Sequence, residues 1–419
     1  MNESDFDEQE MINKVLLSVA YSPTAATWEN IVDFVGELSD PLSYEQINFL
    51  LNEANKVFPA EFTHMNGEDE LERNKLICNI LNFLMYKFDS CMLPSGDFDE
   101  VTYDLFKKIM NCFVPGLQQG AVSNIIDIVT IILKDSPSQA FLAFLISVNF
   151  QEKICNYLMN VNHKEFTYIT NMMIECLYIL FKKLPQETEF LISLCKYLLC
   201  EMNYDTEDKT LKLVCYVVSN YKDTFEIINE NCENFLEIIN QTESYQEIKS
   251  ICKMINNFIQ NDEFLRKLML YNYSTILISK IKYAKNSSKA FRYIMGNIVN
   301  ICKNSLDGCK SFISLGIFNE NVIPFESFLY KKSMISIIQS MIKYAVLPME
   351  YQSTIEDIII TCLETDDEDI ISQTLDLLVL IFTKYFTFDI ETILENLINS
   401  ENQEISSKAI TFYSSIRSN

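Results

Sequence analysis

The chain has 419 residues, more than one compact core organises, so it is expected to form several domains or a repeat array. Hydrophobic residues make up 48% of it, which excludes a disordered protein, and a net charge of −25 would repel a polyanion such as DNA. Eight glycines and nine prolines are too few for the tight turns of sandwiches, barrels or doubly wound sheets, so the composition predicts an all-α fold.

The first hundred residues are the most acidic part of the chain, with 20 acidic and 5 basic side chains. Residues 1–10 contain five acids and no base, and we interpret them as a disordered acidic tail rather than a targeting signal. Ser43 to Gln46 has the Ser-x-x-Gln pattern of a capping box and opens a predicted helix that runs towards Lys56. Trp28 is expected to be a packing anchor. Residues 11–110 are assigned to N-terminal capping helices or divergent repeats.

From residue 111 onward the apolar pattern repeats. Residues 255–261 align with residues 298–304 at an offset of 43, and a second predicted helix follows each segment. Near the C-terminus an apolar set recurs 34 residues later, as Ile371, Leu375, Leu378 and Phe382 followed by Ile405, Ala409, Phe412 and Ile416. Units near 40 residues, each of two or three helices, are typical of an α-solenoid. The sequence therefore predicts helical repeats over residues 111–419.

Single small or polar residues are expected to end helices within these repeats. Asn and Gly tolerate the left-handed backbone conformation in which many helices end. The predicted turn residues, which follow the same long period, are Asn149, Asn231, Asn272 and Gly316.

The thirteen cysteines indicate a reducing compartment. Their number is odd, most lie in apolar runs, and no Cys-x-x-Cys occurs, so we interpret them as free thiols of the core. No apolar run approaches the 18–20 residues that a membrane span requires. The expected location is the cytoplasm, the nucleus or both.

No pattern for catalysis, a cofactor or a metal stands out. The two histidines, His64 and His163, are not at zinc-binding spacing from a cysteine, and no glycine-rich phosphate loop occurs. The acidic run 364–369 lacks the glycine of a calcium-binding loop and is interpreted as the start of a helix. We therefore predict a protein that is not an enzyme and that needs no cofactor.

Residues 289–317 resemble an armadillo repeat. In that family a small residue opens a helix, an Asn follows a small residue and precedes an apolar one, and a turn glycine ends the next helix. These places are held here by Ala290, Gly296, Asn297, Ile298, Ile313, Gly316 and Ile317. The resemblance implies a right-handed α-α superhelix of armadillo or HEAT type over residues 111–419, with a long concave surface for a protein partner.

Two sets of residues are candidate binding sites. In importin-α-type repeats a Trp stands four residues before the Asn, and the Asn holds the backbone of an extended peptide. Here Tyr293 and Asn297 keep this spacing, and Asn300 is expected to lie beside them. The second set is a basic cluster, interpreted either as a solvated face or as a site for an acidic or phosphorylated segment, and it consists of Lys280, Lys282, Lys285, Lys289 and Arg292.

The function that fits these features is a protein-interaction adaptor or scaffold that binds an extended peptide or a helix. Two alternatives stay open: an importin-α-like receptor for basic nuclear cargo, and a regulatory subunit that holds an enzyme such as a phosphatase, or a chaperone regulator. The charge of the binding surface separates them, because acids beside Tyr293 would favour basic cargo and a surface dominated by lysines would favour an acidic partner. Binding of nucleic acid is not expected.

Overall fold

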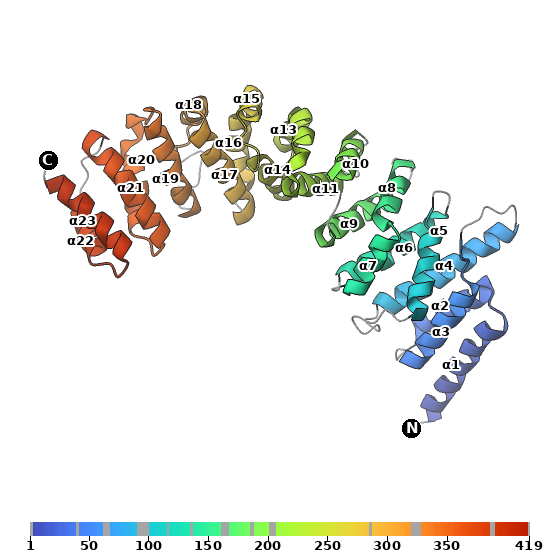
Figure 1. Cartoon of the computed structure of the whole chain (residues 1–419). Coiled ribbons are helices and arrows are strands. Elements are labelled where there is room, and N and C mark those ends of the chain that lie inside the picture. Colours follow the sequence, from blue (N-terminus) through green and yellow to red (C-terminus); the bar gives the residue numbers. More distant parts are fainter. Residues whose placement is uncertain are drawn as a thin grey trace. The chain divides into compact units, whose positions relative to one another are not determined.

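The computed structural model consists of helices and turns, with no strand in the residues it describes (Figure 1). The predicted all-α class is confirmed. The described residues are 3–38, 42–61, 68–89, 100–114, 117–134, 137–160, 167–184, 188–200, 207–284, 287–319, 328–385 and 390–417. The chain divides into two compact units, Met1–Val214 and Cys215–Asn419.

Unit 1, Met1–Val214, holds the first ten helices and the start of an eleventh. They are α1 (Glu3–Tyr21), α2 (Ala25–Glu37), α3 (Tyr44–Val57), α4 (Glu68–Asp89), α5 (Glu100–Cys112), α6 (Gln119–Lys134), α7 (Gln139–Ser147), α8 (Phe150–Asn160), α9 (Thr167–Lys183), α10 (Thr188–Cys200) and α11 (Glu207–Asn220). The acidic tail predicted for residues 1–10 overlaps the start of α1. The predicted boundaries at residues 10 and 110 stay predictions.

Unit 2, Cys215–Asn419, begins within α11. Its further α-helices are α12 (Phe225–Glu230), α13 (Cys232–Gln241), α14 (Tyr245–Asn256), α15 (Asp262–Leu270), α16 (Tyr273–Ala284), α17 (Ser288–Asn304), α18 (Leu306–Ser314), α19 (Phe328–Lys343), α20 (Gln352–Leu363), α21 (Glu368–Tyr385), α22 (Glu391–Ile398) and α23 (Gln403–Arg417). None of the described helices combines the length and apolar composition needed to cross a bilayer.

Within each unit the helices pack in rows, each helix against its counterpart in the next repeat. In unit 1, α2, α4, α6 and α9 form one row, and α1, α3 and α5 form another. In unit 2, α14, α17, α19, α21 and α23 form a row that we call the long-helix row, and α13, α16 and α18 form a second (Figure 1). Contacts that run only between successive repeats define a solenoid.

Local sequence signals account for several helix ends. The capping box is confirmed: Ser43 N donates to Gln46 Oε1 at 2.7 Å, and Gln46 N donates to Ser43 Oγ at 3.3 Å. Three predicted turn residues have positive φ, at 50° for Asn149, 58° for Asn272 and 78° for Gly316. Asn231 lies at the predicted turn, as the C-cap of α12, but its φ is −100°, so the left-handed conformation expected there is absent. Its side-chain amide donates to Ile227 O.

The core is apolar and closely packed. Trp28 is fully buried and its ring lies 5.7 Å from that of Phe83, so its predicted role as a packing anchor is confirmed. Six residues of the repeated C-terminal set are buried as well: Ile371, Leu375, Leu378, Ile405, Ala409 and Phe412. Ile416 is half-buried, and the side chain of Phe382 lies outside the description. Ten of the twelve described cysteines are buried, and all twelve are free thiols.

An ion-pair bridge joins three helices of unit 1. Glu175 on α9 accepts hydrogen bonds from Lys134 Nζ of α6 at 3.0 Å and from Lys209 Nζ of α11 at 2.9 Å. The hydrogen bond from Lys209, followed by that from Lys134, lowers the pKa of Glu175 from 4.5 to about 2. The bridge is partly exposed to solvent, so its contribution to stability is modest.

This bridge predicts a specific dependence of stability on pH. Because the folded pKa of Glu175 lies below its unfolded value, the stabilisation is complete above pH 4.5 and is lost as the pH falls towards about 2. We expect Glu175→Gln to lower the thermal midpoint at neutral pH by the equivalent of at most about 1 kcal/mol. The difference from wild type, followed by calorimetry, should shrink below pH 4.5 and vanish near pH 2. A difference that stays constant over this range would contradict the role of the bridge.

Candidate peptide-binding surface

The residues singled out in the sequence lie on two helices of unit 2. Tyr293, Asn297 and Asn300 belong to α17, together with the basic residues Lys289 and Arg292. Lys280 and Lys282 belong to α16, in the other row. Lys285 lies outside the described residues. The structure therefore divides the predicted basic cluster between the two rows.

Asn297 is fully buried and its side chain is used inside the protein. Its Nδ2 donates to Cys252 O of α14 at 2.8 Å and to Tyr293 O at 2.7 Å, and its Oδ1 accepts from the Tyr273 hydroxyl of α16 at 3.2 Å. One amide thus ties α14, α16 and α17 together. With no exposed surface, Asn297 stabilises this junction, and a peptide on α17 would meet its neighbours instead.

Tyr293 and Asn300 remain on the surface, each half-buried. The spacing of Tyr293, Gly296 and Asn300 places them on one stripe of α17. Asn300 Nδ2 donates to Asn256 Oδ1 of α14 at 2.8 Å. The side-chain oxygen of Asn300, Oδ1, can then accept a hydrogen bond from a partner. A Cβ atom at Gly296 would lie 3.7 Å from Asn256 Oδ1, so α14 and α17 approach closely here.

Lys280 also has a structural role. It is only 4% exposed, and its Nζ donates to Thr242 O at 2.7 Å, at the C-terminal end of α13. Burial lowers the pKa of Lys280, and the nearby charge of Lys282 lowers it further. Lys282 is exposed, with Nζ 4.5 Å from the centre of the Tyr283 ring. Of the predicted cluster, Lys282, Lys289 and Arg292 are the described members that reach solvent.

The structure reveals a larger basic surface that the sequence reading identified only in part. The neighbouring helices α14, α17 and α19 carry eight basic side chains and one acid, Glu247. Lys331 pairs with Asp357 at 2.9 Å and Lys332 pairs with Asp367 at 3.3 Å. The other six form no ion pair within the described part of the chain, and we call them the basic face: Lys249, Lys253, Lys289, Arg292, Lys303 and Lys343.

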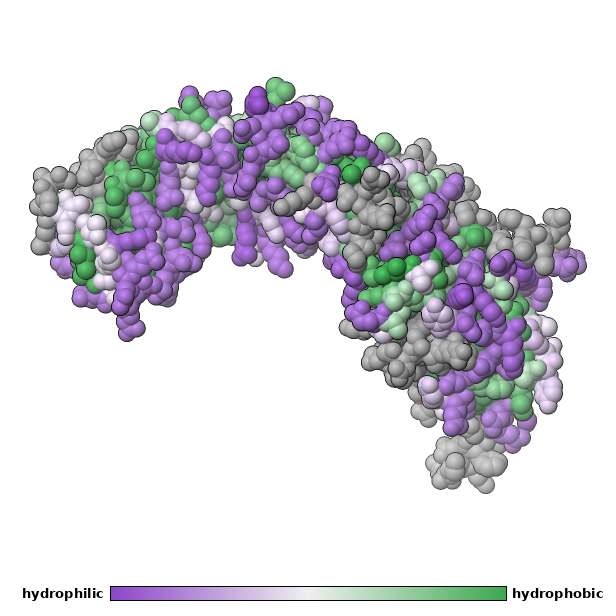
Figure 2. All heavy atoms as spheres, in the orientation of Figure 1, coloured by the Kyte–Doolittle hydropathy of each residue, from purple (hydrophilic) through white to green (hydrophobic). Residues whose placement is uncertain are grey.

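The basic face is a hydrophilic part of unit 2. In the view of Figure 2 the surface over α14 to α19 is mostly hydrophilic. Its sequence signal was the excess of bases in residues 249–343, where 14 basic and 5 acidic side chains occur. The six bases of the basic face are spread over three helices, α14, α17 and α19, and these helices pack as neighbours in one row.

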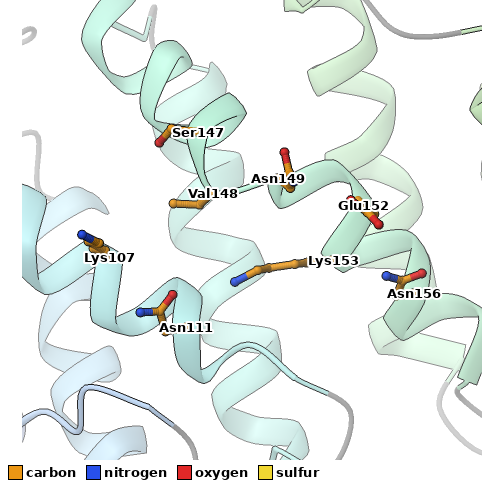
Figure 3. Close-up of a pocket in the computed structure, with 8 residues that line it drawn as sticks. All are labelled: Lys107, Asn111, Ser147, Val148, Asn149, Glu152, Lys153 and Asn156. Carbon is orange, nitrogen blue, oxygen red and sulfur yellow. The ribbon is translucent and has the colours of Figure 1, made fainter.

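Unit 1 has a separate polar cleft between the end of α5 and the α7–α8 turn (Figure 3). Its volume is about 470 Å³, and Lys107, Asn111, Asn149 and Glu152 are among the residues that line it. Lys153 points to the end of α5, where its Nζ donates to Met110 O at 2.5 Å. Lys153 is thus hydrogen-bonded within the protein, and the adjacent Glu152 is an acid. We therefore interpret the cleft as a junction between helices in which Lys153 caps the end of α5, and not as a binding site.

The acidic run 364–369 starts a helix, as predicted. Asp367 Oδ1 accepts from Ile370 N at 3.1 Å, at the first turn of α21. Within the described ranges, no group of three or more His, Cys, Asp or Glu side chains is placed to hold a metal ion. Both histidines, His64 and His163, lie outside those ranges.

Comparisons with known proteins support the fold. No protein-family model matches the chain, and no curated protein matches it. An engineered protein of solved structure is similar over 97% of this chain and 98% of its own, with 11% identity and a TM-score of 0.65. A chain from a study of the phosphorylation switch in the cadherin–beta-catenin interaction aligns over 97% of this chain and 95% of its own, with 10% identity and a TM-score of 0.52. SYS-1 aligns over 97% of this chain and 99% of its own, with 8% identity and a TM-score of 0.47.

At these identities the likeness shows the fold alone. The chain has an armadillo-like α-α superhelical fold, as the sequence predicts. The solved structures are similar over almost the whole chain, including residues 1–110, where the repeat pattern of the sequence is weakest.

The buried position of Asn297 yields a prediction that separates stability from binding. Asn297→Ala removes a buried amide that bonds three groups, two of them in fully buried contacts, so we expect the free energy of unfolding to fall by about 1–3 kcal/mol. Asn300→Ala is the matched control, because its half-buried amide lies where water can replace it, and we expect a change below about 1 kcal/mol. Urea unfolding of the two variants beside wild type makes the comparison. An Asn297→Ala protein as stable as wild type would show that these bonds contribute little.

Proposed function

We propose that the protein is a non-enzymatic interaction scaffold that binds an extended, acidic segment of a partner protein along the long-helix row of unit 2. The observation that carries the proposal is the composition of α17 and α19. These two neighbouring helices contain six basic side chains and no acid, and four of the six form no ion pair among the described residues, in a chain whose acids outnumber its bases by 58 to 33. Such a separation of charge creates a local positive field that attracts anionic groups.

The surface also suits an extended chain. Tyr293, Gly296 and Asn300 follow one stripe of α17 between the basic side chains. The Tyr293 ring offers apolar surface to a partner side chain, and the Oδ1 atom of Asn300 can accept a hydrogen bond from a peptide N–H group. The surrounding lysines and Arg292 would pair with carboxylates or phosphates, which Arg can bind in a bidentate manner.

Phosphorylation would strengthen such an interaction, since each phosphate adds close to two negative charges at neutral pH. In one of the similar solved structures a phosphorylation switch controls the interaction between cadherin and beta-catenin. A phosphorylated acidic segment is therefore the form of partner that we would test beside the unmodified one.

The same charges argue against a receptor for basic cargo. A lysine-rich segment laid on α17 would face Lys289, Arg292 and Lys303, and like charges at that distance are unfavourable. The other alternative, a regulatory subunit that holds an enzyme, is compatible with the proposal, because the enzyme could present an acidic segment to the basic face. The cytoplasm or the nucleus fits the free thiols of the core.

The proposal predicts that binding depends on charge at this face and on salt. We expect a labelled peptide of 16 alternating Glu and Ser residues to bind wild type, by fluorescence anisotropy, more tightly than its Lys–Ser counterpart. The triple variant Lys289→Glu, Arg292→Glu, Lys303→Glu should weaken binding of the acidic peptide about tenfold or more, since several charges act together. Raising the salt concentration should weaken binding to wild type.

The control variant makes the same change in net charge elsewhere. It combines Lys75→Glu, Lys107→Glu and Lys183→Glu, three exposed lysines of unit 1. It should bind the acidic peptide nearly as wild type does. Equal losses in both triple variants would mean that only the net charge matters, and the proposed surface would be wrong.

A further inference from the structure

A cleft in unit 2 differs in chemistry from the basic face. It lies where α11 ends, beside the start of α12 and the turn after α14, and has a volume of about 520 Å³. Half-buried Phe225 and Phe258 and buried Val218 supply its apolar part. The centres of the two phenylalanine rings lie 5.5 Å apart. None of the described residues that line the cleft is ionisable, although the chain as a whole is highly charged.

Three asparagines supply the polar edge of the cleft, and each holds its position through a bond within the protein. Asn220 Nδ2 donates to Tyr216 O at 2.6 Å, and Asn257 Nδ2 donates to Ser219 O at 2.9 Å. Asn261 Oδ1 accepts from Glu263 N and Phe264 N, both at 3.0 Å, as the N-cap of α15. The opposite atom of each amide makes no hydrogen bond to the described residues, so two acceptors and one donor group are available.

A second feature points to a ligand. The hydroxyl of Ser219, which also lines the cleft, is buried and has no hydrogen-bond partner among the described residues. Buried polar atoms are nearly always paired, because an unpaired one is destabilising. An occupant of the cleft that brings a donor or an acceptor would supply the missing partner.

We propose that this cleft binds a short, uncharged segment of a partner protein that packs one large apolar side chain against the rings of Phe225 and Phe258. The neutral lining selects against a charged residue, which would lose its hydration without gaining a counter-charge. The three rim amides can bond the N–H and C=O groups of an extended backbone, as the anchor side chain enters. The volume is in the range that holds one or two such groups. This site does not require the basic face.

The test uses uncharged peptides as the probe. A display library of random heptapeptides without Asp, Glu, Lys, Arg or His is selected on the full-length protein, and an enriched peptide is labelled for fluorescence anisotropy. We expect enriched peptides to share a large apolar residue. Replacing that residue with Ala should weaken binding about tenfold or more, because a buried large side chain contributes that much.

Two variants locate the peptide. Asn220→Tyr fills the mouth of the cleft and should weaken binding at least tenfold. Its matched control is Asn160→Tyr, since Asn160 is likewise exposed at the end of a helix and likewise bonds the carbonyl four residues before it. Ser219→Ala should weaken binding several-fold while leaving the thermal midpoint unchanged or higher, because it removes an unpaired hydroxyl.

The outcomes separate this site from the basic face. Binding that is insensitive to salt and to the Lys289→Glu, Arg292→Glu, Lys303→Glu variant, but is lost in Asn220→Tyr, supports the cleft whatever the fate of the scaffold proposal. A library that yields no enriched peptide, or peptides bound equally by Asn220→Tyr and wild type, overturns it. Acidic-peptide binding that survives Asn220→Tyr leaves the basic face standing alone.

Discussion

Several repeats are joined to the repeat before them by a side-chain donor that bonds a backbone carbonyl at a helix end. Helix ends leave up to four carbonyls without partners, and a buried unpaired carbonyl is costly. Lys153 Nζ donates a hydrogen bond to Met110 O, the Tyr197 hydroxyl donates to Leu158 O, and Lys280 Nζ donates to Thr242 O. The paired residues are 43, 39 and 38 positions apart. A lysine there also interacts favourably with the negative end of the helix dipole. At these junctions, hydrogen bonds as well as apolar packing hold together residues about 40 positions apart.

This constraint decides which polar residues are available to a partner. Lys280 and Asn297 have the residue types of a binding site, yet both are buried because the junctions of α13, α14, α16 and α17 need their donors. Lys289, Arg292 and Tyr293 lie four to eight residues before Asn297 on the same helix, and their side chains reach solvent. In a solenoid one helix both packs against its neighbours and offers surface to a ligand. The position of each residue around the helix decides which of the two roles its side chain has.

The sequence predicted the architecture well because the architecture follows from local signals. Apolar period, the Ser43 capping box and the left-handed turns at Asn149, Asn272 and Gly316 each act within a few residues. At Asn231 the turn between α12 and α13 forms as predicted, but with φ of −100° in place of the left-handed conformation. The burial of Asn297 could not be predicted from the sequence. A motif gives the position of a residue on its helix but not how closely the neighbouring helices cover it. The basic face was visible only as an excess of charge, because its members are spread over 95 residues and meet through packing.

The two surfaces of unit 2 would act on a partner through different physics. A field from several exposed cations extends over about 10 Å and mainly raises the rate of encounter, and salt weakens it. An apolar cleft with fixed amides acts only on contact, and its selectivity comes from shape and from hydrogen bonds that a wrong residue leaves unpaired. A surface that recognises charge alone would bind any acidic segment. Because the protein is itself acidic, other copies of it would compete for the basic face. A neutral cleft is indifferent to that competition, so a protein with both surfaces can bind selectively despite its net charge of −25.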